Sequence, residues 1–138
     1  MKKAVYEEAV LLVSHGSRSP KTKKEISVLV NILRQRLPQE LKECHSRESG
    51  NPIVEFAFLE IESPGIPEGI DRCVSQGATV VVVALNFLNA GRHVDEDIPA
   101  IVLAAQKKYP QVKFAISKPI GQHAQIPDLF IDLINETL

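Results

Sequence analysis

Two histidines of this chain stand close to the expected ends of strands, and imidazole can bind a metal ion or accept a proton. His15 lies two positions after the end of the apolar run 9–13, beyond Ser14, and precedes a segment of helical pattern. His93 lies shortly after the apolar run 79–85. In an open parallel sheet the carboxyl ends of the strands share one edge, where ligands bind. The two residues are therefore candidates for a site that handles a metal ion, a proton or both.

The segments that must position these histidines alternate between strand and helix patterns. Short apolar runs predict strands over 9–14, 53–59, 79–85 and 112–117. Helical spacing and terminal signals predict helices from Ser19 to before Pro38, over 67–76, from Asp97 to about Tyr109, and over 126–138. This alternation predicts an α/β fold, a three-layer sandwich with a four-stranded parallel sheet and helices on both faces, comparable to a flavodoxin-like half. The continuous run 79–85 is typical of a strand buried on both faces.

The order of the strands in the sheet decides whether the two histidines meet. In the order 2-1-3-4, the first and third strands are neighbours, and His15 and His93 face one cleft. For either histidine alone, a loop residue that caps or packs is the commoner outcome. The shared edge, with Gly16 and Gly91 allowing close approach of a ligand, favours a functional site. Two imidazoles cannot close a structural zinc site, so any metal ion would be held loosely.

Length and composition limit the classes of protein to which the chain can belong. Its 138 residues suit one domain with a single core, which we expect to span 1–138. A formal net charge of −1 gives no field for nucleic acid or a membrane surface, so neither is expected as a partner. We find no signal-peptide pattern and no apolar stretch near the ~20 residues that cross a bilayer. Cys44 and Cys73 are too few for a disulfide framework, and we expect a cytoplasmic protein.

Residues 44–52 interrupt this alternation. The segment is polar, rich in turn-forming residues and without helical or strand periodicity, which predicts an exposed surface insertion. Cys44 beside His45 is a weak metal signal because no further ligand lies nearby in the sequence. We therefore expect the insertion to have no chemical role.

Five motifs, taken together, resemble those of the small sirohydrochlorin cobaltochelatase family, the short form of the class II tetrapyrrole chelatases. They are Ser-His-Gly-Ser-Arg (14–18), Ala-Phe-Leu-Glu (57–60), Pro-Gly-Ile-Pro-Glu-Gly-Ile (64–70), Asn-Phe-Leu-Asn-Ala-Gly-Arg-His-Val-Asp-Glu-Asp-Ile-Pro (86–99) and Pro-Ile-Gly-Gln-His (119–123). Each motif alone is weak, but five in order at the expected spacing are a strong signal. Two positions depart from the pattern: Leu85 replaces a usual proline, and Ser63 replaces a glutamate found in some relatives.

The resemblance implies a chelatase that inserts a divalent metal ion into sirohydrochlorin, in cobalamin- or siroheme-type biosynthesis. The metal ion is then a substrate, Co²⁺ first with Ni²⁺ or Fe²⁺ as alternatives, and no prosthetic group is expected. His15 and His93 are implied as catalytic residues and metal ligands, with His15 as proton acceptor. The implied tetrapyrrole contacts are Glu60, Ser63, Leu88, Asn89, Ala90, Gly91 and Arg92. A homodimer is implied as well.

The chemistry of the substrate agrees with these residue types. Metal insertion strips water from the ion and removes two pyrrole protons, and a neutral histidine can assist either step. Sirohydrochlorin carries many carboxylates, which Arg18 and Arg92 could bind.

Other functions remain open on the sequence. A metal or tetrapyrrole carrier on the same fold would have the same motifs, and only turnover would separate it from an enzyme. A histidine-dependent phosphatase also places a His-Gly pair after its first strand. That chemistry needs a cation directly before the histidine, where this chain has Ser14.

The predicted insertion generates a first test. Replacing residues 43–52, which include the insertion 44–52, by a short turn that joins Lys42 to Ile53 should leave a folded, active protein, since loop length costs only about 0.6 kcal/mol per doubling. Thermal unfolding and metal-insertion assays of the deletion variant check this expectation. A folded but inactive variant would instead assign the segment a functional role.

Overall fold

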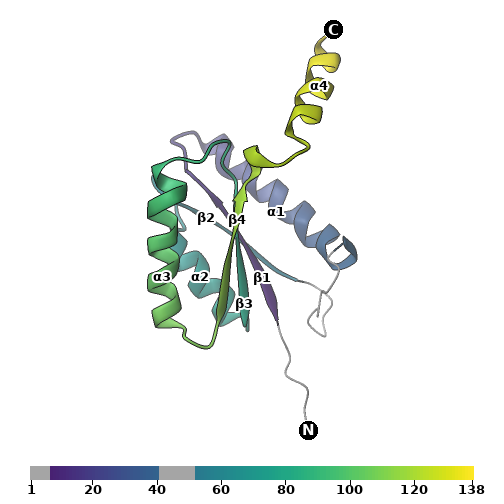
Figure 1. Ribbon diagram of the computed structural model, residues 1–138. Helices are drawn as coiled ribbons and strands as arrows, with labels where there is room; N and C mark the ends of the chain where they lie inside the picture. Colours follow the sequence, from purple (N-terminus) through teal and green to yellow (C-terminus); the bar gives the residue numbers. More distant parts are fainter. Residues whose placement is uncertain (1–6, 41–51) are drawn as a thin grey trace.

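The computed structural model describes residues 7–40 and 52–138, without the side chains of 38–40 (Figure 1). The strands are β1 (Glu8–Ser14), β2 (Ile53–Phe58), β3 (Val80–Leu85) and β4 (Lys113–Pro119). The helices are α1 (Pro20–Glu40), α2 (Ile66–Ser75), α3 (Ile98–Lys108) and α4 (Ile126–Thr137). Two short turns complete the set, the π-helical η1 (His93–Asp97) and the 3₁₀-helical η2 (Ile120–Gln122). Most of the predicted insertion, 44–52, lies outside the described residues.

The strands form one four-stranded parallel sheet in the order β2-β1-β3-β4, which confirms the predicted α/β fold. This is the order in which His15 and His93 are expected to face one cleft. The register aligns the strand ends, because Ser14 lies opposite Phe58 on one side of β1 and Val13 lies opposite Leu85 on the other. The segments that follow β1, β2 and β3 therefore emerge side by side at one edge. No described helix is long and apolar enough to cross a membrane.

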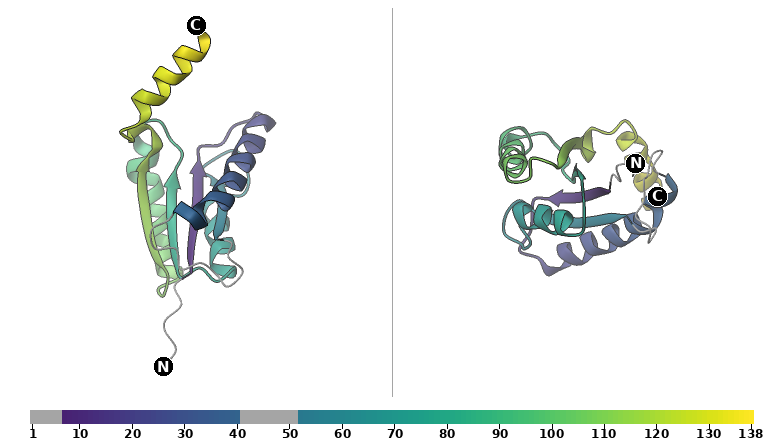
Figure 2. Two further views of the ribbon diagram at one scale, coloured as in Figure 1. Left: turned by 90° about the vertical axis from the view of Figure 1, so that its right-hand side faces the viewer. Right: turned by 90° about the horizontal axis from the view of Figure 1, so that it is seen from below.

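Three helices cover the sheet (Figure 2). On one face, α2 and α3 bury a cluster with the sheet that includes Ile70, Cys73, Ile98 and Val102. On the other face, α1 packs alone, and its buried residues Ile26 and Val30 contact Leu12, Val54 and Phe58 of β1 and β2. The two faces are thus covered unequally.

The unequal cover corrects two expectations. Strand β3 is not buried on both faces: Val81, Val83 and Leu85 are buried, while the residues between them are only half-buried. Helix α4 forms as predicted but has no buried residue, and it projects beyond the carboxyl edge of the sheet (Figures 1 and 2). Within residues 7–40 and 52–138, no helix therefore covers the β3 side of the α1 face.

The end of α1 also differs from the prediction, because the helix continues past Pro38 to Glu40. Proline removes one backbone hydrogen bond and crowds the preceding turn. Contacts between the turn before Pro38 and the sheet offset the free-energy cost of placing a proline within the helix. Leu33 and Leu37 pack against the α1 cluster, and the Arg34 guanidinium donates two hydrogen bonds to the carbonyl oxygen of Val54, at 2.6 and 3.1 Å.

The core under α2 predicts the effect of a cavity. Ile70 is 1% exposed and belongs to the larger buried cluster, so Ile70→Ala should cost about 2–5 kcal/mol of unfolding free energy. Leu103→Ala on the exposed side of α3 is the matched control and should change stability by less than about 0.5 kcal/mol. Denaturant titration of both variants checks the difference, and equal costs would contradict the assignment of this core.

Candidate metal centre

The turn after β1 positions His15 beside the turn after β2. The amides of Leu59 and Glu60 donate hydrogen bonds to the carbonyl oxygens of Ser14 and His15, both at 2.9 Å. Gly16 adopts φ +105°, and a Cβ at this position would lie 1.9 Å from the carbonyl oxygen of Glu60. A glycine is needed here for both reasons, since other residues are strained at this φ and the space is already filled. The two turns are thereby held in direct contact.

His93 reaches the same edge from the other side, on a π-helical turn. Its carbonyl oxygen accepts a hydrogen bond from the amide of Ile98, five residues later, so η1 leads directly into α3. The helix therefore begins before Asp97, where the sequence predicted its start. Such π turns are frequent at functional sites. Here the turn places Asp97 against the His93 ring, with 2.7 Å between Nδ1 and Oδ2.

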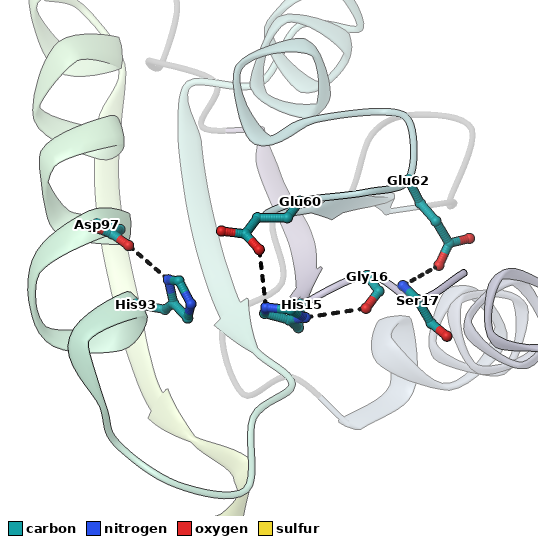
Figure 3. Close-up of polar contacts among 7 residues, drawn as sticks. All are labelled: His15, Gly16, Ser17, Glu60, Glu62, His93 and Asp97. Carbon is teal, nitrogen blue, oxygen red and sulfur yellow. Dashed lines mark hydrogen bonds and ion pairs between the residues drawn. The ribbon is translucent and has the colours of Figure 1, made fainter. Parts of the chain in front are cut away.

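The three side chains His15, Glu60 and His93 converge at this edge (Figure 3). The imidazole centroids of His15 and His93 are 5.3 Å apart, and Nε2 of His15 lies 3.3 Å from Oε2 of Glu60. One possible ligand atom from each residue lies within 4.8 Å of the others. Metal–ligand bonds of about 2.0–2.2 Å need a slightly tighter cluster, which small side-chain rotations can provide.

The hydrogen bonds orient both rings toward a shared ligand. Nδ1 of His15 lies 3.2 Å from the carbonyl oxygen of Gly16, which can only accept, so Nδ1 is the protonated nitrogen. Nδ1 of His93 donates to the carboxylate of Asp97 in the same way. Each neutral imidazole then keeps its lone pair on Nε2. Nε2 of His15 lies 3.3 Å from Oε2 of Glu60, so a proton or a metal ion placed between these two atoms would stabilise their contact.

The cluster is open to solvent. The side chains of His15, Glu60 and His93 are 45%, 50% and 41% exposed. Three protein ligands in an open site leave positions for water or a further ligand, unlike a closed four-ligand structural site. This arrangement can accept a hydrated ion and release it again.

The residues predicted to contact a tetrapyrrole lie around the same edge, all exposed. The loop before His93 contains Leu88, Asn89, Ala90, Gly91 and Arg92. The amide of Gly121 donates to the carbonyl oxygen of Phe87 at 3.0 Å, and Gly121 packs so closely on Leu88 that no Cβ would fit, which anchors this loop to η2. Nε of Arg92 pairs with Glu96 at 3.2 Å.

Two other predicted contacts flank His15 and Glu60. Ser63 follows Glu60 in the turn after β2, and Arg18 follows His15 just before α1. The intervening Glu62 accepts a hydrogen bond from the amide of Ser17 at 2.7 Å, which ties the two turns together a second time. No described contact joins Arg18 or Ser63 to the metal cluster itself.

The sequence did not predict the contact of Asp97 with His93, and it predicted Glu60 as a substrate contact only. The sequence predicts Asp97 only as the first residue of a helix, although its spacing of four from His93 is a signal for side-chain contact on a helix. Glu60 follows the strand next to β1 in the expected order, which could have placed it beside His15. His123 does not join the cluster, and its Nδ1 accepts a hydrogen bond from the amide of Gln125 at 3.1 Å.

The fold and the cluster together define an α/β protein in which two histidines and one carboxylate, a set that could hold a metal ion, converge in an open site at the carboxyl edge of the sheet. Residues 9–137 match the model of the CbiX family. The chain belongs to this family, which confirms the family resemblance drawn from the five motifs.

Named relatives of the chain are sirohydrochlorin chelatases. The chain is 32% identical over 136 residues to a sirohydrochlorin ferrochelatase of Priestia megaterium, covering 99% of this chain and 47% of that protein. It is 32% identical over 129 residues to a sirohydrochlorin cobaltochelatase of Sulfolobus acidocaldarius, covering 94% and 91%. The sirohydrochlorin chelatase SirB from Bacillus subtilis subspecies spizizenii, solved in complex with cobalt, superposes with a TM-score of 0.77 at 28% identity, covering 94% and 50%. The chain thus spans about half the length of several relatives that it matches.

The contact between Asp97 and His93 generates a prediction for metal affinity. Asp97→Asn keeps the size of the side chain but weakens the acceptor that orients the His93 ring, so the affinity for Co²⁺ should fall about 10–100-fold. Asp95→Asn, an exposed neighbour on the same turn, is the matched control and should bind as the parent does. Calorimetric titration with Co²⁺ at fixed pH measures both, and equal affinities would show that Asp97 does not position His93.

Proposed function

We propose that this protein is a sirohydrochlorin chelatase, which inserts a divalent metal ion into the tetrapyrrole. The observation that carries the proposal is the open cluster of His15, Glu60 and His93 in a member of the CbiX family. The cluster offers the ligands that first-row divalent ions accept, and its exposure suits an ion that must be passed on.

The ion is the substrate in this reaction. Nε2 of His15, Nε2 of His93 and the Glu60 carboxylate would replace part of its water shell and hold it at the edge of the sheet. Insertion releases two protons from pyrrole nitrogens, while the four-nitrogen macrocycle takes over the ion. As the ion leaves, Nε2 of His15 and the adjacent Glu60 carboxylate regain free lone pairs and can accept these protons. The 3.3 Å spacing of the two groups lets them share a proton.

The exposed residues around the cluster supply contacts for the macrocycle. The loop 88–92 and the turn that carries Glu60 and Ser63 border the metal centre on two sides. The peripheral carboxylates of sirohydrochlorin suit Arg18 and Arg92, because guanidinium groups bind carboxylates through paired hydrogen bonds. Arg92 would exchange its exposed partner Glu96 for a substrate carboxylate at little cost, since such surface ion pairs contribute at most about 1 kcal/mol.

We propose Co²⁺ as the first metal to test, with Fe²⁺ and Ni²⁺ beside it. Two imidazoles and a carboxylate bind all three ions, and site affinity alone discriminates weakly among them. The relatives support more than one ion, because their names include both cobaltochelatases and ferrochelatases.

We further propose that the working form is a homodimer. One copy supplies a single edge with one metal cluster and no second wall for a macrocycle. The ferrochelatase relative from Priestia megaterium is about twice as long, since this chain matches 47% of it. A second copy related by two-fold symmetry would supply the missing wall.

The central prediction concerns the two histidines. His93→Ala or His15→Ala should lower the rate of metal insertion at least about 10²-fold, because each removes an ion ligand and His15 also accepts a proton. Both side chains are exposed, so unfolding free energies should change by less than about 0.5 kcal/mol. His123→Ala is the matched control, an exposed histidine outside the cluster.

The assay follows the absorbance of sirohydrochlorin under anaerobic conditions with Co²⁺, Fe²⁺ or Ni²⁺. Multiple turnovers by the parent protein support an enzyme. Binding of ion and tetrapyrrole without turnover would instead indicate a carrier. Near-parental activity of His93→Ala would refute the two-histidine mechanism.

A further inference from the structure

The turn after β2 holds an isoleucine in a backbone conformation that this residue type rarely adopts. Ile61 has φ +70°, and among the described residues it alone has a positive φ without being glycine. The amide of Glu62 donates a hydrogen bond to the carbonyl oxygen of Glu60 at 2.7 Å, which closes a three-residue turn around Ile61. This is a γ-turn with positive φ, the rarer and strained form of that turn. The β-branched side chain adds to the strain, because it crowds the backbone at this φ.

Contacts on both sides of Ile61 impose this conformation. The amide of Glu60 donates to the carbonyl oxygen of His15 at 2.9 Å. The carboxylate of Glu62 accepts a hydrogen bond from the amide of Ser17 at 2.7 Å. The residues before and after Ile61 are thus both bonded to the turn after β1, and a single residue must join them. The backbone at this position is therefore set by its neighbours, whichever side chain it carries.

The side chain of Ile61 does not offset the strain by packing in the core. It is 61% exposed, and within the described part of the chain it joins neither of the two buried clusters. A glycine would form the same turn without strain, and an asparagine would form it with less. In the free protein, the isoleucine thus strains the backbone and exposes apolar surface to water. Backbone strain of this kind gathers at sites where it serves function.

The position of Ile61 beside the metal cluster indicates what that function is. Figure 3 shows the carboxylates on either side of it directed to the turn after β1, Glu60 to His15 and Glu62 to the amide of Ser17. The exposed Ile61 side chain lies between them in the chain. An ion that leaves the cluster for the centre of a macrocycle requires the ring to face the cluster. A residue adjacent to Glu60 is then close to the ring.

A second exposed aliphatic side chain stands on the other side of the cluster. Leu88 is 67% exposed, and it lies on the segment after β3 that also carries His93. The segments after β2 and β3 flank the segment after β1, because β1 lies between these strands in the sheet. Each flanking segment therefore carries one residue of the metal cluster and one aliphatic side chain open to solvent.

We propose that Ile61 is a substrate-binding residue that packs against an apolar face of the tetrapyrrole, together with Leu88. The inference rests on the proposed function and names the contact that the turn after β2 makes with the substrate. The ring of sirohydrochlorin has apolar faces and carries its carboxylates at the rim. Aliphatic side chains beside the cluster suit the faces, while Arg18 and Arg92 suit the rim. The surface that Ile61 exposes in the free protein is then buried when the substrate binds.

The first experiment measures stability. Asparagine tolerates a positive φ and has no β-branch, so Ile61→Asn should raise the melting temperature by about 2–6 °C. Val28→Asn is the matched control, since Val28 is also β-branched and is 58% exposed, but lies within α1. It should leave the melting temperature nearly unchanged, because valine and asparagine have similar helix propensities. A lower melting temperature for Ile61→Asn would show that the isoleucine stabilises the free protein, and would overturn the proposal.

The second experiment measures binding of the tetrapyrrole alone. Metal-free protein is titrated into sirohydrochlorin under anaerobic conditions, and the absorbance is followed. Ile61→Asn should bind about 5–30-fold more weakly than the parent, because an aliphatic side chain is no longer removed from water. Ile61→Leu keeps an aliphatic side chain of the same size and should bind nearly as the parent does, as should Val28→Asn. Parental affinity in Ile61→Asn would overturn the proposal.

Binding of Co²⁺ separates contact with the ring from support of the cluster. Ile61→Asn should bind Co²⁺ as the parent does, because His15, Glu60 and His93 remain and the turn keeps its backbone hydrogen bonds. A parallel loss of affinity for Co²⁺ and for sirohydrochlorin would show that Ile61 acts by supporting the cluster, and would overturn the proposal.

Turnover distinguishes this proposal from the proposed function. In an active chelatase, Ile61→Asn should raise the KM for sirohydrochlorin and leave kcat nearly unchanged. A parent that binds sirohydrochlorin more tightly than Ile61→Asn but never inserts metal would refute the chelatase function and support the contact. A parent that inserts metal with the same KM as Ile61→Asn would support the function and refute the contact.

Discussion

The contact between the turn after β1 and the turn after β2 is the interaction on which the candidate metal cluster of His15, Glu60 and His93 depends. Its backbone hydrogen bonds from Leu59 and Glu60 extend the pairing of the two strands past their ends. Gly16 makes the contact possible, because its φ of +105° and its missing side chain admit the carbonyl oxygen of Glu60. A flexible exposed carboxylate is thereby held beside His15 without being buried, so the pair stays accessible to an incoming ion.

The other half of the cluster is held by different means. His93 stands on a helical turn, and its ring is oriented by Asp97 from one turn later. The preceding loop is anchored to η2 through Gly121, so the end of β4 also contributes to the position of His93. A site built from two independently held halves can adjust its ligand spacing by small movements of one half. That property suits an ion that is bound, stripped of water and then released.

The incomplete cover of the sheet connects the architecture to the proposed reaction. One edge of the sheet cannot enclose a macrocycle. Helix α1 alone also leaves part of its face of the sheet uncovered. Helix α4, which has no buried residue, leaves the sheet at the same edge that bears the cluster (Figure 1).

The sequence by itself determined the strands, their parallel arrangement and the positions of His15 and His93 near strand ends, because short-range patterns and the handedness of parallel crossovers leave few alternatives. The order of the strands, which brings the two histidines together, came from the structure. The family motifs pointed to the same residues. Only the tertiary structure decided that Glu60 joins the histidines, that Asp97 orients His93, that α1 passes Pro38 and that α4 projects from the sheet. These features depend on contacts between segments far apart in the chain, and the periodicity of a helix shows which side is apolar but not which surface will cover it.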